Sequence, residues 1–234
     1  MSQHTVASFD QELEELRRCI AEMGGHVEKM LADAVGALVR RDVELAQIVV
    51  ASDVRVDALQ REIEERAVLT IARRQPMAID LREVISAIRV ASDIERIGDM
   101  AKNIGKRTIA VSGQFEPQRV VLGIERMSDK VLVQLKAVLD AYMQKDVEAA
   151  LEVWRRDGET DSHYNSIFRE LLTYMMEDPR NITFCTHLLF CAKNVERIGD
   201  HATNIAETIH YLVTGQTIAA ERPKLDRTAF ETGE

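Results

Sequence analysis

A five-residue segment that occurs twice constrains this chain more than any other feature of its sequence. The segment ERIGD spans Glu95–Asp99 and returns unchanged at Glu196–Asp200, 101 positions later in a chain of 234 residues. The flanks correspond as well, because an Asn-Ile pair follows both copies, beginning at Asn103 and at Asn204. Two domains of about 100 residues each fit a chain of this length. We therefore predict two copies of one structural unit.

Composition and the spacing of apolar residues both indicate helices. Aromatic residues make up 5% of the chain, and there are only four prolines and eleven glycines. These values favour helices over sheets. Apolar residues recur at helical spacing along nearly the whole chain, without a convincing alternating pattern of a strand. We therefore predict an all-α fold.

Turn signals divide this pattern into six helices, three in each half. We expect helices over residues 9–40, 42–74 and 77–111 in the first half, then over 117–144 and 146–178, and a last helix that ends at 214. Three kinds of signal occur in both halves: an aspartate that caps a helix, a proline that breaks one and a glycine that ends one. They are Asp42 and Asp146, Pro76 and Pro179, and Gly113 and Gly215.

The matched signals predict two tandem antiparallel three-helix bundles related by pseudo-two-fold symmetry. We expect residues 1–113 to form the first bundle and residues 114–215 to form the second. Long helices joined by short turns are typical of such bundles. Residues 216–234 lack periodicity and are expected to form a flexible tail.

Charge and cysteine content limit the classes of function. The net charge of −9 at pH 7 argues against non-specific nucleic-acid binding, which depends on basic residues that neutralise phosphates. Three cysteines without a CxxC motif favour a reducing compartment, and the sequence shows neither a signal peptide nor a membrane span. We expect a cytoplasmic protein that reaches a membrane only through partners, since anionic lipids repel an acidic chain.

Each copy of the repeat carries two carboxylates four residues apart, Glu95 and Asp99 in the first copy and Glu196 and Asp200 in the second. On a helix such residues lie on one face, where like charges repel each other. At about 100° per residue, they fall almost opposite the apolar stripe of their helix, with the asparagine of each copy in phase. We therefore expect both pairs on an outer surface, open to solvent or to a partner.

A second pair of carboxylates with the same spacing precedes each repeat. Asp53 and Asp57 lie on the second expected helix, and Asp157 and Asp161 lie on the fifth. Antiparallel helices joined at a proline turn bring both pairs of a half to about the same height, so that four carboxylates converge. Such an all-oxygen set suits a hard or borderline cation such as Mg²⁺, Ca²⁺, Mn²⁺ or iron.

Other interpretations of the acidic pairs stay open. Arg96 and Arg197 lie beside them and can neutralise them through salt bridges without a metal, and a plain scaffold can carry such stripes as solvated faces or as docking surfaces for basic partners. A di-iron enzyme or a metal-dependent phosphohydrolase is a further alternative. Helical di-iron enzymes show Glu-x-x-His motifs, however, and no such histidine follows either pair. The sequence also lacks a phosphate-binding loop, so we expect a protein that is not an enzyme.

The two halves and their repeated motif resemble the PhoU family of phosphate-regulation proteins. The resemblance covers essentially all of residues 5–215, and residues 194–205 are especially similar to the family pattern. It implies that Glu95, Asp99, Glu196 and Asp200, with the four aspartates beside them, bind divalent or trivalent metal ions such as iron, Mg or Mn, in multinuclear clusters.

The resemblance also implies a regulatory role. PhoU-like proteins couple the ATPase subunit of the high-affinity phosphate ABC transporter to a membrane sensor histidine kinase, and they restrain the phosphate-starvation response when phosphate is plentiful. The chain is therefore expected to be a cytoplasmic adaptor and a negative regulator of that response, to modulate phosphate uptake, and to form a homodimer.

Overall fold

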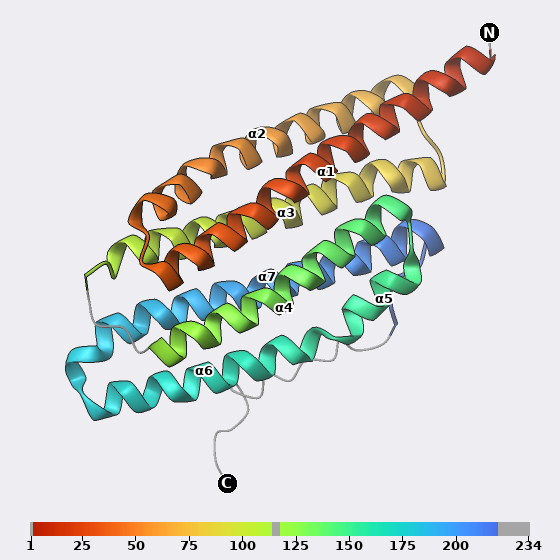
Figure 1. Cartoon of the computed structure of the whole chain (residues 1–234). Coiled ribbons are helices and arrows are strands. Elements are labelled where there is room, and N and C mark those ends of the chain that lie inside the picture. The colour runs from red at the N-terminus through yellow and green to blue at the C-terminus, as the bar shows by residue number, and fades with distance from the viewer. Residues whose placement is uncertain (1, 114–117, 220–234) are drawn as a thin grey trace.

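The computed structural model describes residues 2–113 and 118–219, with side chains from Phe9 onward, and over these ranges it contains helices and no strand. The elements are α1 (Ser2–Arg40), α2 (Val43–Arg74), α3 (Ile79–Ala110), α4 (Gln118–Gln144), α5 (Val147–Arg155), α6 (Asp157–Glu177), the short 3-10 helix η1 (Pro179–Asn181) and α7 (Ile182–Thr214) (Figure 1). None of these helices is both long and apolar enough to cross a membrane. The all-α fold class is confirmed. The helix start predicted at residue 117 and residues 220–234 of the predicted tail lie outside the described residues.

Both predicted aspartate caps are confirmed. The side chain of Asp42 accepts a hydrogen bond of 2.9 Å from the backbone N–H three residues later, and Asp146 does the same at 3.1 Å. Each bond satisfies one of the donors that the first turn of a helix leaves unpaired. Arg41 and Lys145, which precede the caps, both adopt positive φ, at 58° and 54°. The first two helices of each half are therefore joined by the same tight turn.

Three of the predicted helix-end signals are confirmed as well, whereas α3 ends at Ala110 with Val111 as its C-cap, ahead of the predicted Gly113. Gln75 ends α2 and Asp178 ends α6, each directly before a proline, which removes a backbone donor and disfavours helical backbone at the preceding residue. Gly215 ends α7 with a φ of 74°, a left-handed conformation that glycine adopts without steric cost. At the other end of the chain the prediction was too short, because α1 begins at Ser2 rather than at Phe9.

The fifth predicted helix is wrong in one respect, because the structure divides it into α5 and α6. Between them Arg156 has φ −89° and ψ 1°, outside the helical region. The next two residues, Asp157 and Gly158, are both poor helix formers. At the matching place in the first half, Asp53 is followed by Val54, and there α2 continues without a break.

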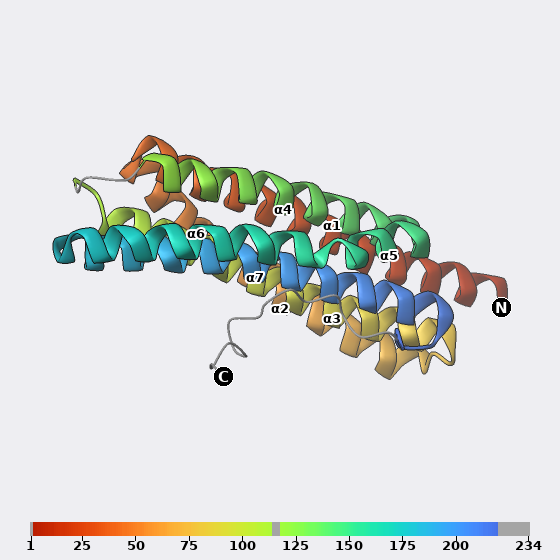
Figure 2. The same ribbon diagram turned by 90° about the horizontal axis from the view of Figure 1, so that it is seen from below.

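The two bundles lie side by side, with their helices along one common direction (Figures 1 and 2). All three helices of the first half contact one another, and α7 contacts α4, α5 and α6 in the second half. Contacts between the halves join α3 to α7 and α1 to α4. Within the described ranges, α2 and α6 contact only elements of their own half. The central helices α3 and α7 are therefore surrounded by neighbours from both halves.

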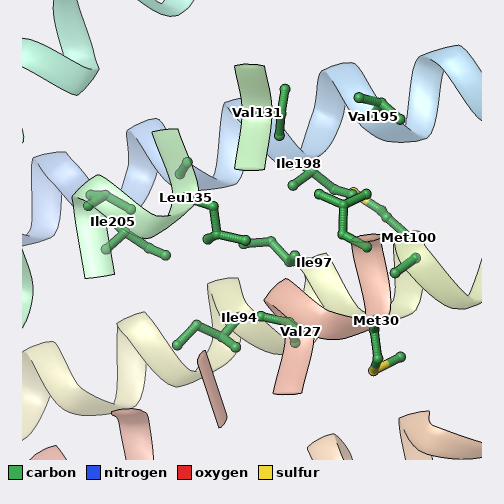
Figure 3. Close-up of a cluster of buried hydrophobic side chains, with 14 of the residues drawn as sticks. Val27, Met30, Ile94, Ile97, Met100, Val131, Leu135, Val195, Ile198 and Ile205 are labelled. Atoms are coloured by element: carbon green, nitrogen blue, oxygen red, sulfur yellow. The ribbon is translucent and has the colours of Figure 1, made fainter. Parts of the chain in front are cut away.

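One hydrophobic core runs through both halves. Figure 3 shows side chains from α1, α3, α4 and α7 in a single cluster, including Val27, Ile97, Leu135 and Ile198. All four are completely buried. The apolar stripes predicted for the third and sixth helices are confirmed, and burial of this shared surface is the main force that holds the halves together.

Candidate functional site

The eight carboxylates singled out by the sequence gather at two helix contacts. We define the first acidic site as Asp53 and Asp57 on α2 with Glu95 and Asp99 on α3. The second acidic site is Asp157 and Asp161 on α6 with Glu196 and Asp200 on α7. Each site therefore joins the carboxylate pair of one repeat, on a central helix, to the acidic pair on the helix beside it.

Half of these carboxylates are buried. Of the four that were predicted to lie on an open outer surface, Glu196 is the buried one, so the prediction is wrong for Glu196. The exposed fractions of Asp53, Asp157, Asp161 and Glu196 are 5%, 5%, 6% and 5%. The reason is that α2 packs on α3 and α6 packs on α7, which covers much of the face opposite each apolar stripe. The first site stays open at Asp99, whose side chain is 36% exposed.

A lysine holds the two halves of the first acidic site together. Lys102 Nζ donates a hydrogen bond of 2.6 Å to Oδ1 of Asp99 on its own helix, and it also forms an ion pair with Asp53 of α2. Burial lowers the pKa of Lys102, but the hydrogen bonds to the two aspartates outweigh it and raise the pKa well above its ordinary value. The ammonium group is therefore charged and bridges α2 and α3.

Glu95 shows that the four carboxylates of the first site act on one another. Burial raises the pKa of Glu95 most, and the charge of Asp99 raises it next, followed by smaller effects of Asp57 and Asp53. Arg96 opposes this shift, with its Nε 3.7 Å from a Glu95 carboxylate oxygen. The predicted salt bridge thus exists, but its arginine is largely exposed and leaves the pKa of Glu95 raised.

In the second acidic site, the buried carboxylate of Glu196 is only half satisfied. Its Oε1 accepts a hydrogen bond of 2.8 Å from Lys193 Nζ, whereas its buried Oε2 finds no hydrogen-bond partner among the described residues. Burial is the main cause of a raised pKa of Glu196. Lys193 opposes the shift, and the charges of Asp200 and Asp161 add to it. A buried carboxylate oxygen without a partner is costly, and a bound cation would satisfy it.

A hydroxyl replaces the bridging lysine in the second site. Thr203 lies 101 residues after Lys102, and its Oγ1 donates a hydrogen bond of 2.8 Å to Oδ1 of Asp157. Asp157 is the counterpart of Asp53, so the same pair of positions is linked by an ammonium in one half and by a hydroxyl in the other. Neither Lys102 nor Thr203 was predicted as part of a site. The signal for Lys102 was its place three residues after Asp99, where opposite charges meet on a helix.

The glycine of each repeat lies at the contact between the two helices of its site. A Cβ atom on Gly98 would lie 3.2 Å from Cγ1 of Val56 on α2. A Cβ atom on Gly199 would lie 3.6 Å from Cγ2 of Thr160 on α6, an ordinary contact distance. Close helix packing at the repeated glycine is therefore found in the first half, where the fit is tighter.

The asparagine of the second repeat, Asn204, lies in phase with Glu196 and Asp200, but its side chain contacts the other half of the chain. Nδ2 of Asn204 donates a hydrogen bond of 3.3 Å to Asp93 on α3, and the same carboxylate oxygen lies 2.8 Å from Nδ1 of His201. These contacts link α7 to α3 across the junction of the halves. Asn204 and His201 thus contribute to the contact between the bundles.

The chemistry of both sites suits a hard cation, because every donor of the two sets is a carboxylate oxygen. Burial is the main cause of the raised pKa values of Glu95 and Glu196, and the neighbouring carboxylates of each site add to the shift. Within the described part of the chain, no three His, Cys, Asp or Glu side chains are grouped closely enough to hold a metal ion as they stand. Side chains would therefore have to rotate before an ion could be bound.

Solved structures share this architecture. The crystal structure of PhoU from Pseudomonas aeruginosa superposes with a TM-score of 0.86 at 41% identity, over 89% of this chain and 100% of that chain. The crystal structure of the phosphate transport system regulatory protein PhoU from Streptococcus pneumoniae superposes with a TM-score of 0.84 at 28% identity, over 91% of this chain and 100% of that chain.

Sequence comparisons agree with this likeness. The phosphate-specific transport system accessory protein PhoU homolog of Rhizobium meliloti (strain 1021) is 57% identical over 97% of this chain and 95% of its own length. The homolog of Caulobacter vibrioides (strain NA1000 / CB15N) is 54% identical over 97% of this chain and 98% of its own length. The family model described as PhoU domain matches twice, over residues 20–108 and 124–209. The chain therefore belongs to the PhoU family, and each of its halves is one PhoU domain.

Proposed function

We propose that this chain is a negative regulator of the phosphate-starvation response, acting as an accessory protein of a phosphate-specific transport system. The observation that carries this proposal is the likeness to accessory proteins of that system at 57% identity over nearly the full length of both chains. The aligned length covers both halves of the chain, as expected for a relative with the same two-domain architecture.

The regulator acts by contact and not by catalysis. In this proposal it couples the ATPase subunit of the phosphate ABC transporter to a sensor histidine kinase and so modulates phosphate uptake. It works in the cytoplasm as a homodimer and reaches the membrane through these partners, and its net charge of −9 is unsuited to nucleic acid. A metal-dependent helical enzyme is the less favoured alternative, since the relatives bear the names of accessory and regulatory proteins.

We further propose that both acidic sites bind metal ions, with iron, Mn²⁺ and Mg²⁺ as the candidates, either singly or in multinuclear clusters. The ligands in the first site would be Asp53, Asp57, Glu95 and Asp99, and those in the second would be Asp157, Asp161, Glu196 and Asp200. Oε2 of Glu196 has no hydrogen-bond partner in the part of the chain that the structure describes, and this supports the proposal, as does the all-oxygen donor set. A bound ion would neutralise the carboxylates and join α2 to α3, or α6 to α7, without any chemical step.

Deletion of the gene tests the regulatory role. In phosphate-rich medium the deletion strain should express its phosphate-uptake genes, as measured with a transcriptional reporter, and the wild-type gene supplied in trans should restore repression. Normal repression in the deletion strain would refute the assignment. The enzyme alternative predicts instead that a defect is rescued by a product of the missing reaction.

Complementation with metal-site variants separates regulation from metal binding. A gene that carries Glu196→Ala and Asp200→Ala should produce a folded protein with less bound metal, and its ability to repress shows whether the ion takes part in regulation. The matching variant of the first site carries Glu95→Ala and Asp99→Ala. If both double variants bind as much metal as the wild type, neither acidic site is a metal site.

A further inference from the structure

The junction between the two halves carries charged groups at one of its ends. Glu83 of α3 is buried, with an exposed fraction of 7%. Its Oε2 accepts a hydrogen bond of 2.7 Å from Nζ of Lys145, which directly follows α4, and its Oε1 lies 3.6 Å from Nη1 of Arg17 on α1. Because α4 belongs to the second half, the pair of Glu83 and Lys145 joins the halves through a buried carboxylate.

A tyrosine of α4 completes this group, which we call the Glu83 cluster: Arg17, Glu83, Tyr142 and Lys145. Tyr142 is buried. Burial is the main cause of a raised pKa of Tyr142, and the negative charge of Glu83 raises this pKa further, whereas Arg17 lowers it. The phenol, the carboxylate and the guanidinium group therefore act on one another across the junction.

The charged groups of the Glu83 cluster are incompletely hydrogen-bonded. Oε1 of Glu83 and Nε of Arg17 are buried and find no hydrogen-bond partner among the residues that the structure describes. A buried polar atom without a hydrogen bond costs free energy, and the desolvation of a buried ion pair can exceed the attraction between its charges. This end of the junction is therefore held less strongly than a well-packed apolar contact would hold it.

The matching positions at the other end of the junction are apolar. The offset of 104 residues between the two aspartate caps relates α1 to α4, and the offset of 101 between the two repeats relates α3 to α7. The matched pairs are Arg17 and Val121, Tyr142 and Leu38, and Glu83 and Phe184. We call Leu38, Val121 and Phe184 the apolar set, and all three are buried members of the hydrophobic core. The fourth counterpart, Arg41 for Lys145, is charged but exposed.

The Glu83 cluster and the apolar set lie at opposite ends of the molecule. The cluster lies where α3 begins and α4 ends, and the apolar set lies where α1 ends and α7 begins (Figure 1). Each end also has an arginine of α3 over an aromatic ring of α7, Arg89 over Tyr211 and Arg107 over Phe190. Because this contact occurs at both ends, the buried charge of the Glu83 cluster is what distinguishes them.

We propose that the Glu83 cluster is a latch at which the two halves separate locally, while the end with the apolar set stays closed. Opening at the cluster returns a carboxylate, a guanidinium and an ammonium group to water, which hydrates them. Opening at the apolar set exposes hydrophobic side chains to water, which is unfavourable. The first opening therefore costs less free energy than the second. This inference concerns the junction alone and depends neither on the proposed metal binding nor on the proposed regulatory role.

Hydrogen exchange of the full-length protein, followed by mass spectrometry, tests the proposal. A helix end that leaves its neighbours frays, because most helical stability comes from packing, and its amides then exchange without global unfolding. Residues 136–142 of α4 lead to Tyr142, and their counterparts 32–38 of α1 lead to Leu38, before the same type of tight turn. After correction for intrinsic rates, residues 136–142 should exchange faster by about tenfold or more. Equal rates, or faster exchange of residues 32–38, would overturn the proposal.

Two variants should change the opening in opposite directions. Glu83→Gln removes the charge that pairs with Lys145 and Arg17, and the loss of one partner of a buried ion pair is destabilising, so exchange of residues 136–142 should accelerate by about tenfold. A triple variant with Arg17→Leu, Glu83→Leu and Lys145→Met replaces the charges with apolar groups, a change that is often neutral or stabilising. It should slow exchange of residues 136–142 to within about threefold of residues 32–38.

A matched control separates the latch from ion pairs in general. Glu22 pairs with Arg55 on the surface of the first half, and Glu22→Gln should change the exchange of either segment by less than about twofold, since exposed pairs contribute little. If Glu83→Gln accelerates both segments equally, the cluster supports only global stability and the proposal is overturned. A folded triple variant that opens as readily as the wild type also overturns it. If circular dichroism shows that the triple variant does not fold, the wild type and Glu83→Gln decide.

Discussion

The first and second acidic sites share a frame and differ in how its charge is balanced. Both place two carboxylates on a central helix and two on the helix packed against it. The first has a half-buried ammonium, Lys102, that bridges the helices. The second has a threonine in its place and a lysine, Lys193, bonded to Glu196, whose other carboxylate oxygen has no hydrogen-bond partner among the described residues. The difference teaches that after a duplication the ligands can stay alike while the groups that set their charge diverge.

Removal of the carboxylate pairs of the two repeats has the largest expected effect, a loss of metal affinity, and tests whether both sites bind metal. Glu196→Ala with Asp200→Ala should weaken Mn²⁺ binding at the second site by at least about 100-fold, since the loss of a group that merely supports a ligand already costs 10–100-fold. Glu95→Ala with Asp99→Ala should do the same at the first site. Metal analysis after dialysis measures both, and unchanged metal content in both variants would rule out the acidic sites as metal sites.

Removal of the Thr203 hydroxyl has the next largest expected effect, on the stability of the protein. Thr203→Val should lower the free energy of unfolding of the metal-free protein by about 1–3 kcal/mol, the usual cost of a hydrogen bond removed from a buried polar group. Thr203→Ser, which keeps the hydroxyl, is the control and should cost less. Urea denaturation in the presence of a chelator measures both variants. Equal stability of the two variants would show that Asp157 does not depend on this bond.

The repeated glycines test how tightly each site is packed. Gly199→Ala should stabilise the protein by about 1 kcal/mol, because alanine is the better helix former and a Cβ finds an ordinary contact there. A gain of that size raises the Tm by about 2–4 °C in a chain of this length. Gly98→Ala should gain less, since its Cβ would lie only 3.2 Å from Val56. A larger gain at Gly98 would show that the first site is the looser one.

The smallest expected effect is a dependence on pH that differs between the sites. The pKa values of Glu95 and Glu196 are raised above 4.5 in the folded protein, so the folded state holds these protons more firmly than the unfolded state. Stability of the metal-free protein therefore falls as the pH rises from about 4.5 through the folded pKa values. Above that window Glu196→Gln should be more stable than the wild type, and below it the two should be alike.

Glu95→Gln provides the comparison, because Glu95 has a 19% exposed side chain and Glu196 a 5% exposed one. The gain at pH 7.5 should be smaller for Glu95→Gln, of the order of 1 °C in Tm. Thermal unfolding at pH 4 and pH 7.5 with a chelator measures both. A Glu196→Gln protein that is less stable than the wild type at pH 7.5 would show that the ion pair with Lys193 outweighs burial.

Much of the fold could be predicted because its signals are local. Asp42 and Asp146 cap helices through bonds to residues three positions away, and Pro76 and Pro179 act on the residue directly before them. The break at Arg156 was missed, although Asp157 and Gly158 are poor helix formers, because the long apolar pattern around them outweighed two residues. Propensity is a weak guide where tertiary packing decides.

The carboxylates of the candidate site could be singled out from the sequence, whereas the residues around them could not. Spacing places Glu95 and Asp99 on one face of α3 whatever lies opposite them. How far they are covered depends on α2, and on the fact that α3 is enclosed by both halves, which the pattern within one helix cannot reveal. Lys102 was overlooked for the same reason, since its link to Asp53 spans 49 residues.

The hydrophobic core shared by the two halves has a consequence for the history and folding of the chain. Because α3 and α7 bury apolar side chains against each other, a single half on its own would expose much of that surface to water. A domain of about half this size also buries a smaller fraction of its surface, so we expect the two halves to melt in one cooperative transition. The duplicated copies are thus free to diverge at their acidic sites, but neither copy can be discarded without unfolding the other.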